Sequence, residues 1–117
     1  MKSNFRTANE AFLYFYDLIN HRDMSEPFDN TRALFNIGFN IHEPLNNHIT
    51  APYRNWNLDY AEAEWQWYLT GDRNIETLGE LYGKIPAIWK RMADGDNNVH
   101  SNYGYQWERG YQLDKVV

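Results

Sequence analysis

The N-terminal part of the chain has the hydrophobic spacing of an amphipathic helix. Apolar residues between positions 8 and 19 recur three and four places apart, and Thr7 and Glu10 form a capping-box pattern before them. We therefore predict a helix that ends near His21 and covers a sheet. The following stretch, 22–32, mixes charges with a proline and shows no sustained period, which predicts a loop.

Strict alternation of apolar and polar residues follows this loop. From Phe35 to Ile41 every second residue is apolar, and Glu43-Pro44 then closes the pattern. This is the period of a half-buried strand.

A second helix is predicted from Asn57, with Gly71 as its C-terminal stop. Trp67 falls opposite the main apolar stripe, so we expect this helix to be buried between layers. Glu64 lies about a quarter of a turn from the centre of the stripe, where a carboxylate must be paired, hydrated or functional. The predicted stripe consists of Leu58, Ala61, Trp65, Tyr68 and Leu69.

Two shorter helical patterns follow. Pro86 stands in the first turn of one of them, and the polar run 95–98 ends it. The last residues begin another apolar stripe. The first pattern comprises Ile85, Ile88, Trp89, Met92 and Ala93, and the second Leu113, Val116 and Val117.

Composition narrows the class of protein. The chain has 117 residues, a net charge of −5 and no cysteine. This length favours one domain, 1–117, and the negative charge argues against binding to duplex nucleic acid or a membrane surface. Without cysteine the chain has no disulfide, no cysteine-bound zinc and no thiolate nucleophile. It shows no signal-peptide pattern and no apolar run near the roughly 20 residues that span a bilayer, so we expect a cytoplasmic protein.

Metal and phosphate-loop chemistry find no support in the sequence. The four histidines are too far apart for a helical His-x3-His pair, and we expect no metal. Glycine-rich loops of the dinucleotide or Walker type are absent.

Three blocks in the second half of the chain carry the most specific signal. They are Glu64-Trp65-Gln66-Trp67-Tyr68-Leu69-Thr70-Gly71-Asp72-Arg73-Asn74-Ile75, the pair Ile88-Trp89, and Tyr103-Gly104-Tyr105-Gln106-Trp107. In this order and spacing they resemble the N-terminal half of thymidylate synthases and of the related phage deoxycytidylate hydroxymethylases. With 35–41 taken as the first core strand of that family, the resemblance covers about residues 5–117.

The resemblance implies an α+β fold, with helices packed on a mixed β-sheet, and a one-carbon transfer reaction. In that family 5,10-methylenetetrahydrofolate gives its carbon to C5 of a pyrimidine deoxynucleoside monophosphate, after a cysteine has added to C6. Glu64 matches the glutamate that organises water and proton transfer, and Tyr103 matches the tyrosine near the C5 proton. Ile88 and Trp89 match the pair that packs on the folate ring. For each of these residues a purely structural role is the alternative.

The phosphate-binding arginine is matched less closely. Arg32 falls near the family's N-terminal arginine loop, which grips the nucleotide phosphate, but the usual Arg-Thr-Gly-x-Gly run is replaced by Asn30-Thr31-Arg32-Ala33. Arg22 is the fallback candidate.

Several parts of the family's catalytic machinery have no counterpart here. The nucleophilic cysteine, the paired arginines donated across the dimer and the asparagine that reads the pyrimidine would all follow residue 117. We therefore expect an incomplete N-terminal half that is inactive alone and that forms a homodimer or joins a complementing C-terminal half. Ser101-Asn102 before Tyr103 is closer to the hydroxymethylase form, but the choice between dUMP and dCMP stays open. The alternative is a non-catalytic phage or prophage protein for binding or assembly, derived from the same fold.

Overall fold

The structure is a computed structural model, and it describes residues 1–21 and 31–116. The predicted loop at 22–32 lies outside these residues except for its last two positions. The chain divides into two compact units, Met1–Trp56 and Asn57–Val117, which are described separately. In the described residues no helix has the length and apolar character needed to cross a membrane.

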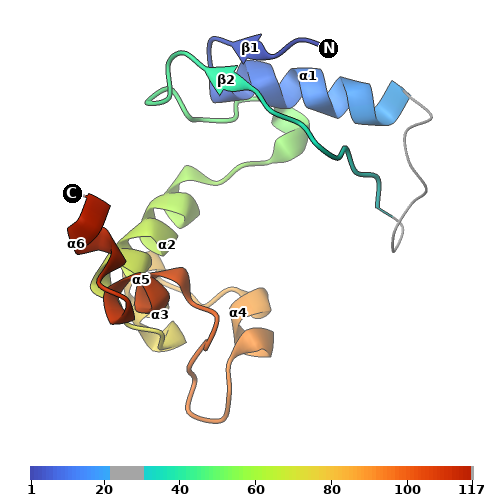
Figure 1. The fold of residues 1–117 in the computed structure, drawn as a ribbon. Coiled ribbons are helices and arrows are strands. Elements are labelled where there is room, and N and C mark those ends of the chain that lie inside the picture. Colours follow the sequence, from blue (N-terminus) through green and yellow to red (C-terminus); the bar gives the residue numbers. More distant parts are fainter. Residues whose placement is uncertain (22–30, 117) are drawn as a thin grey trace. The chain divides into compact units, whose positions relative to one another are not determined.

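The first unit is built on one long helix, α1 (Ala8–His21), as the sequence predicted (Figure 1). The capping box is formed, because the Thr7 hydroxyl accepts from the Glu10 amide at 3.2 Å and the Glu10 carboxylate accepts from the Arg6 amide at 2.7 Å. The Asn9 side chain also accepts from the amides of Thr50 and Ala51, at 2.9 and 3.1 Å. These bonds fix the start of α1 against the residues that precede the 3-10 turn Pro52–Arg54.

A very small parallel sheet lies beside this helix. Strand β1 (Asn4–Phe5) pairs with β2 (Asn40–Ile41), in the register Asn4 to Asn40 and Phe5 to Ile41. Phe5 is almost fully buried, and its ring contacts Phe15 and Phe39 at 5.5 and 5.8 Å between centroids. The described residues thus belong broadly to the α+β class, with mostly helical structure.

The predicted strand over 35–41 is wrong for most of its length. Only Asn40 and Ile41 pair, while Phe35 is 73 % exposed and Asn36 has a left-handed φ of 56°. A strand needs a partner as long as itself, and β1 offers two residues. The alternation of apolar and polar residues shows which residues could form a strand. It does not show whether a neighbouring strand is present to pair with them.

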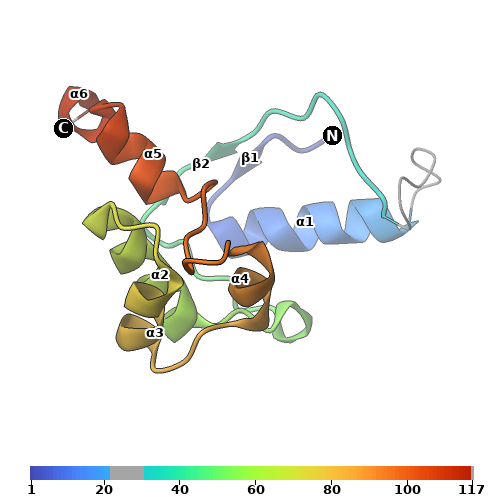
Figure 2. The same cartoon turned by 90° about the horizontal axis from the view of Figure 1, so that it is seen from below.

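The second unit is helical. Helix α2 (Leu58–Thr70) begins and ends as predicted, since Asn57 accepts from the Tyr60 amide at 2.9 Å and Gly71 is left-handed at φ 69°. It is followed by α3 (Ile75–Tyr82) and α4 (Ala87–Met92), and then by α5 (Tyr103–Arg109) and α6 (Gln112–Val116) (Figure 1). Figure 2 shows α2 and α3 lying side by side.

The buried face of α2 differs from the predicted stripe. Trp67 is completely buried, whereas Trp65 and Leu69 are half exposed. The reason is α3, which the sequence analysis did not predict and which packs against the Trp67 side of α2. The core of this unit consists of Ala63, Trp67, Tyr68, Ile75, Leu78 and Val99.

Candidate functional site

Four of the five predicted site residues lie in the second unit. Glu64 stands on α2, Ile88 and Trp89 stand on α4, and Tyr103 is the first residue of α5. Residues separated by up to 39 positions thus come from three helices that share one core.

A glycine sets the close packing of α5 on α2. A Cβ added at Gly104 would lie 1.9 Å from the main-chain oxygen of Tyr68, so no other residue fits without moving the helices apart. Asn102, which is buried, caps α5 by accepting from the Tyr105 amide at 2.9 Å. Tyr103 is therefore held next to Tyr68, and their rings meet edge to face at 5.8 Å.

Glu64 lies between two tyrosines on its own helix. The Tyr68 hydroxyl donates to Glu64 Oε1 at 2.8 Å. Burial, followed by this carboxylate, raises the pKa of Tyr68 above its usual value. Tyr60 is one turn away on the other side of Glu64, and burial and the same carboxylate raise the pKa of Tyr60 to about 12. Both phenols are therefore protonated at neutral pH, and the Tyr68 hydroxyl donates to Glu64.

Trp89 joins this group from α4. Its indole Nε1 donates to the Tyr60 hydroxyl at 2.7 Å, and its ring meets the buried Trp67 edge to face at 5.2 Å. Ile88, its neighbour, is 48 % exposed. Ile88 therefore presents apolar surface to solvent, whereas the Trp89 indole is partly buried against the core.

Tyr103 is the most exposed member of the candidate site. Its side chain is 63 % exposed and stacks on Trp107 at 6.3 Å with an interplanar angle of 16°. Among the described contacts Tyr103 reaches Glu64 through the ring of Tyr68. The Tyr103 phenol is thus accessible to solvent, and stacking on Trp107 restricts the orientation of its ring.

Arg32 belongs to the first unit and has a structural contact there. Its Nη1 donates to the main-chain oxygens of Ile19 and Asn20, at 3.4 and 3.3 Å. A cation at these carbonyls stabilises the C-terminal end of α1. Arg32 and the other four candidates thus belong to different units, and the fallback Arg22 lies outside the described residues.

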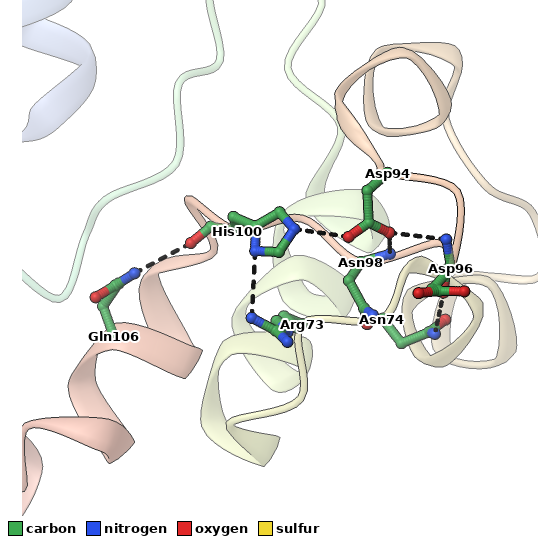
Figure 3. A network of polar contacts seen from close by, with 7 residues as sticks. All are labelled: Arg73, Asn74, Asp94, Asp96, Asn98, His100 and Gln106. Atoms are coloured by element: carbon green, nitrogen blue, oxygen red, sulfur yellow. Dashed lines mark hydrogen bonds and ion pairs between the residues drawn. The ribbon is translucent and has the colours of Figure 1, made fainter.

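A polar network secures the chain between α4 and α5 (Figure 3). Asp94 accepts from the amides of Asp96 and Asn98, each at 2.9 Å, and from His100 Nε2 at 2.6 Å. These amides, and then His100, hold the pKa of the Asp94 carboxyl below its usual value. Arg73 Nη1 donates to His100 Nδ1 at 3.3 Å, so His100 bridges the carboxylate and the guanidinium.

The same network also positions the first turn of α5 relative to the turn that follows α2. Gln106 on α5 donates to the main-chain oxygen of His100 at 3.0 Å, and Arg73 lies over the Tyr105 ring at 4.6 Å. The Asn74 side chain in turn donates to the main-chain oxygen of Asp96 at 3.2 Å. The Asn74-containing turn after α2 and the first turn of α5 are therefore tied together, which supports the placement of Tyr103.

Sequence reasoning missed Tyr60, Tyr68 and the Asp94 network as parts of the site. The two tyrosines could have been found, because they stand four residues before and after Glu64 and so share its helix face. The Asp94 network had no comparable signal. Its members depend on how 94–100 folds back onto the turn after α2.

Comparison with models of known protein families found no match for this chain, and comparison with solved structures found none either.

Proposed function

We propose that this chain is the cysteine-free N-terminal part of a cytoplasmic enzyme with a thymidylate-synthase-like α+β fold. The enzyme would transfer a one-carbon unit from 5,10-methylenetetrahydrofolate to C5 of dUMP or dCMP. The observation that carries the proposal is the meeting of Glu64, Trp89 and Tyr103 in one helical unit, linked by Tyr60 and Tyr68.

The surroundings of each residue support its proposed role. When bound, the folate supplies the carbon. Ile88 and Trp89 offer an apolar surface for its ring. Glu64, which accepts from the Tyr68 phenol, is held in place for ordering water and moving a proton, and the exposed Tyr103 phenol can relay a proton through water.

Covalent addition at C6 needs a thiolate, which this chain does not contain. We therefore propose that the cysteine, the paired phosphate-binding arginines and the base-reading asparagine come from a complementing segment. That segment would be a C-terminal half, because a homodimer of this chain alone would still lack the cysteine. Arg32 remains the proposed phosphate ligand of this chain, in competition with its contact to the end of α1.

Ligand binding by the chain itself tests the proposal. Tetrahydrofolate, titrated with dUMP or dCMP present, should bind, and Ile88→Ser should weaken binding roughly tenfold, equivalent to about 1.4 kcal/mol. Leu81→Ser is the matched control, because Leu81 is 47 % exposed, nearly as much as Ile88, but stands on α3. No binding to the folded chain, or equal weakening by both variants, would refute the folate surface.

The non-catalytic alternative is favoured by one observation. The chain has no cysteine, and it exposes Trp65 and Tyr103 around the partly buried Trp107, as a binding protein could. The coding sequence after codon 117 separates the two readings. A Pro-Cys-His block with paired arginines, in frame or in a neighbouring gene, supports the enzyme, whereas a stop codon with no such segment supports a binding or assembly protein.

A further inference from the structure

Three side chains on α2 form a line on one face of the helix. Tyr60, Glu64 and Tyr68 are spaced by four residues, which places each one turn from the next. Tyr68 donates to Glu64 at 2.8 Å at one end of the line. At the other end the Tyr60 hydroxyl receives the indole N–H of Trp89 at 2.7 Å.

The donor and acceptor properties of these groups fix the direction of the contacts. An indole N–H can only donate, so the Tyr60 oxygen is the acceptor and its own proton is free to point away from Trp89. Glu64 stands one turn further along the same face of α2, and its carboxylate, after burial, raises the pKa of the Tyr60 phenol. The ring of Tyr82 also contacts Tyr60, but the Tyr82 hydroxyl accepts from Asn57 at 3.1 Å.

We infer that Tyr60 is a positioning residue that couples the Trp89 indole on α4 to the Glu64 carboxylate on α2. Tyr60 fixes Glu64 from one side and Tyr68 fixes it from the other. A ring packed on Ile88 and Trp89 would thereby meet a carboxylate whose orientation depends on the same indole. This consequence for the reaction rests on the proposed function, whereas the coupling itself is a property of the chain.

The coupling can be measured on the full chain without any activity. The indole N–H resonance of Trp89, assigned with Trp89→Phe, is followed in a ¹H–¹⁵N correlation spectrum. We expect Glu64→Gln to shift this resonance when Tyr60 is present. In a Tyr60→Phe background the same change should shift it at least about threefold less, as in a double-mutant cycle.

Tyr68→Phe provides the matched control. Tyr68 also donates to Glu64, but no contact joins it to the Trp89 nitrogen. In that background Glu64→Gln should still shift the Trp89 resonance. An equal shift with and without Tyr60 would overturn the inference. So would the absence of a shift in Glu64→Gln alone, a result that needs no Tyr60 variant to fold.

Adding tetrahydrofolate separates this inference from the proposed function. Coupling that persists in a chain which does not bind tetrahydrofolate would refute the folate surface and leave the positioning role of Tyr60 intact. Binding by a chain without coupling would refute the positioning role alone.

Discussion

Glu64 is the side chain on which the proposed chemistry depends most. It is only partly buried, and it receives the Tyr68 hydroxyl while Tyr60 lies one turn away. The bond from the Tyr68 phenol restrains the orientation of this carboxylate, and proton transfer depends on such orientation. A substitution that keeps the size of the Glu64 side chain and its hydrogen-bond acceptor can therefore separate the effect of Glu64 on turnover from its effect on stability.

Glu64→Gln is that substitution. In the proposed enzyme, with the proposed cysteine-bearing segment added, we expect turnover to fall roughly 10²- to 10⁴-fold, the range for a positioned proton-transfer group. Stability should change little, because the amide oxygen still accepts from Tyr68. Steady-state kinetics and urea unfolding give the two measurements, with the exposed Glu62→Gln as control. Full turnover in an unstable variant would make Glu64 a structural residue.

Asp94 provides a second prediction, for pH. Its folded pKa is lowered below the ordinary 3.8 by the amides of Asn98 and Asp96, followed by His100. A lowered pKa means that this carboxylate stabilises the fold above the unfolded-state value and loses that effect as pH falls through the folded-state value. We therefore expect the stability difference between wild type and Asp94→Asn to shrink as pH decreases below about 4.

Chemical denaturation between pH 3 and pH 7 measures this difference. Asp96→Asn is the control, because Asp96 contacts Asn74 and Asp94 through its main-chain atoms, so its difference from wild type should show no such trend. A difference for Asp94→Asn that stays constant over this range would mean that the carboxylate charge does not stabilise the 94–100 segment.

At the scale of elements, helix ends set by local capping residues were predictable from the sequence, whereas the pairing of strands was not. Asn57 and Gly71 specify the ends of α2 through their own conformations, so the sequence located this helix correctly. The strand over 35–41 depended on a partner, which provides two residues in β1. Helix α3 was missed although Asn74 caps it and Gly83 ends it, because its eight residues give a short periodic signal.

The same contrast applies to the candidate site. The motif blocks identified Glu64, Trp89 and Tyr103, and the structure places them in one unit. Which face of α2 is buried depended on the packing of α3: the expected burial on the Trp67 side is present, but Trp65 of the predicted stripe is half exposed. Contacts within a turn of helix follow from spacing, while contacts between helices follow from how they pack.

The crossing of α5 over α2 yields the next prediction. Gly104→Ala would place a methyl group 1.9 Å from the Tyr68 oxygen, so α5 must move outward. We expect a loss of about 1–3 kcal/mol in the free energy of unfolding, the usual cost of overpacking. The edge-to-face contact of Tyr68 with Tyr103 should weaken as well, which near-ultraviolet circular dichroism would detect.

Gly95→Ala is the matched control for this substitution. A Cβ at Gly95 meets no heavy atom within 4 Å, so the change should stay within about 0.5 kcal/mol of wild type. Equal stability of the two variants would show that α5 does not pack as closely on α2 as the glycine contact indicates.

For the whole molecule, the lack of cysteine leads to a prediction about activity. The purified chain alone should transfer no one-carbon unit to dUMP or dCMP, since no thiolate can add to C6. A radiolabelled-folate assay checks this, with host synthase removed by expression in a strain that lacks it. Measurable transfer would refute the view that the catalytic nucleophile comes from another segment.

The exposed apolar surface of the chain leads to the last prediction, which concerns association. Phe35 and Leu45 are 73 % and 94 % exposed in the first unit, and Trp65 and Ile88 are about half exposed in the second. Burying a few hundred Å² of such surface, at about 25 cal/mol per Å², yields several kcal/mol against the entropic cost of association. We expect the chain to form dimers or larger species at micromolar concentrations, as sedimentation velocity would detect.

Phe35→Asn with Leu45→Asn should weaken this association without unfolding the chain, because neither side chain is buried. A compact monomer that binds no hydrophobic dye would show that these side chains do not form an interface, and would favour a binding protein complete in itself over half of an enzyme.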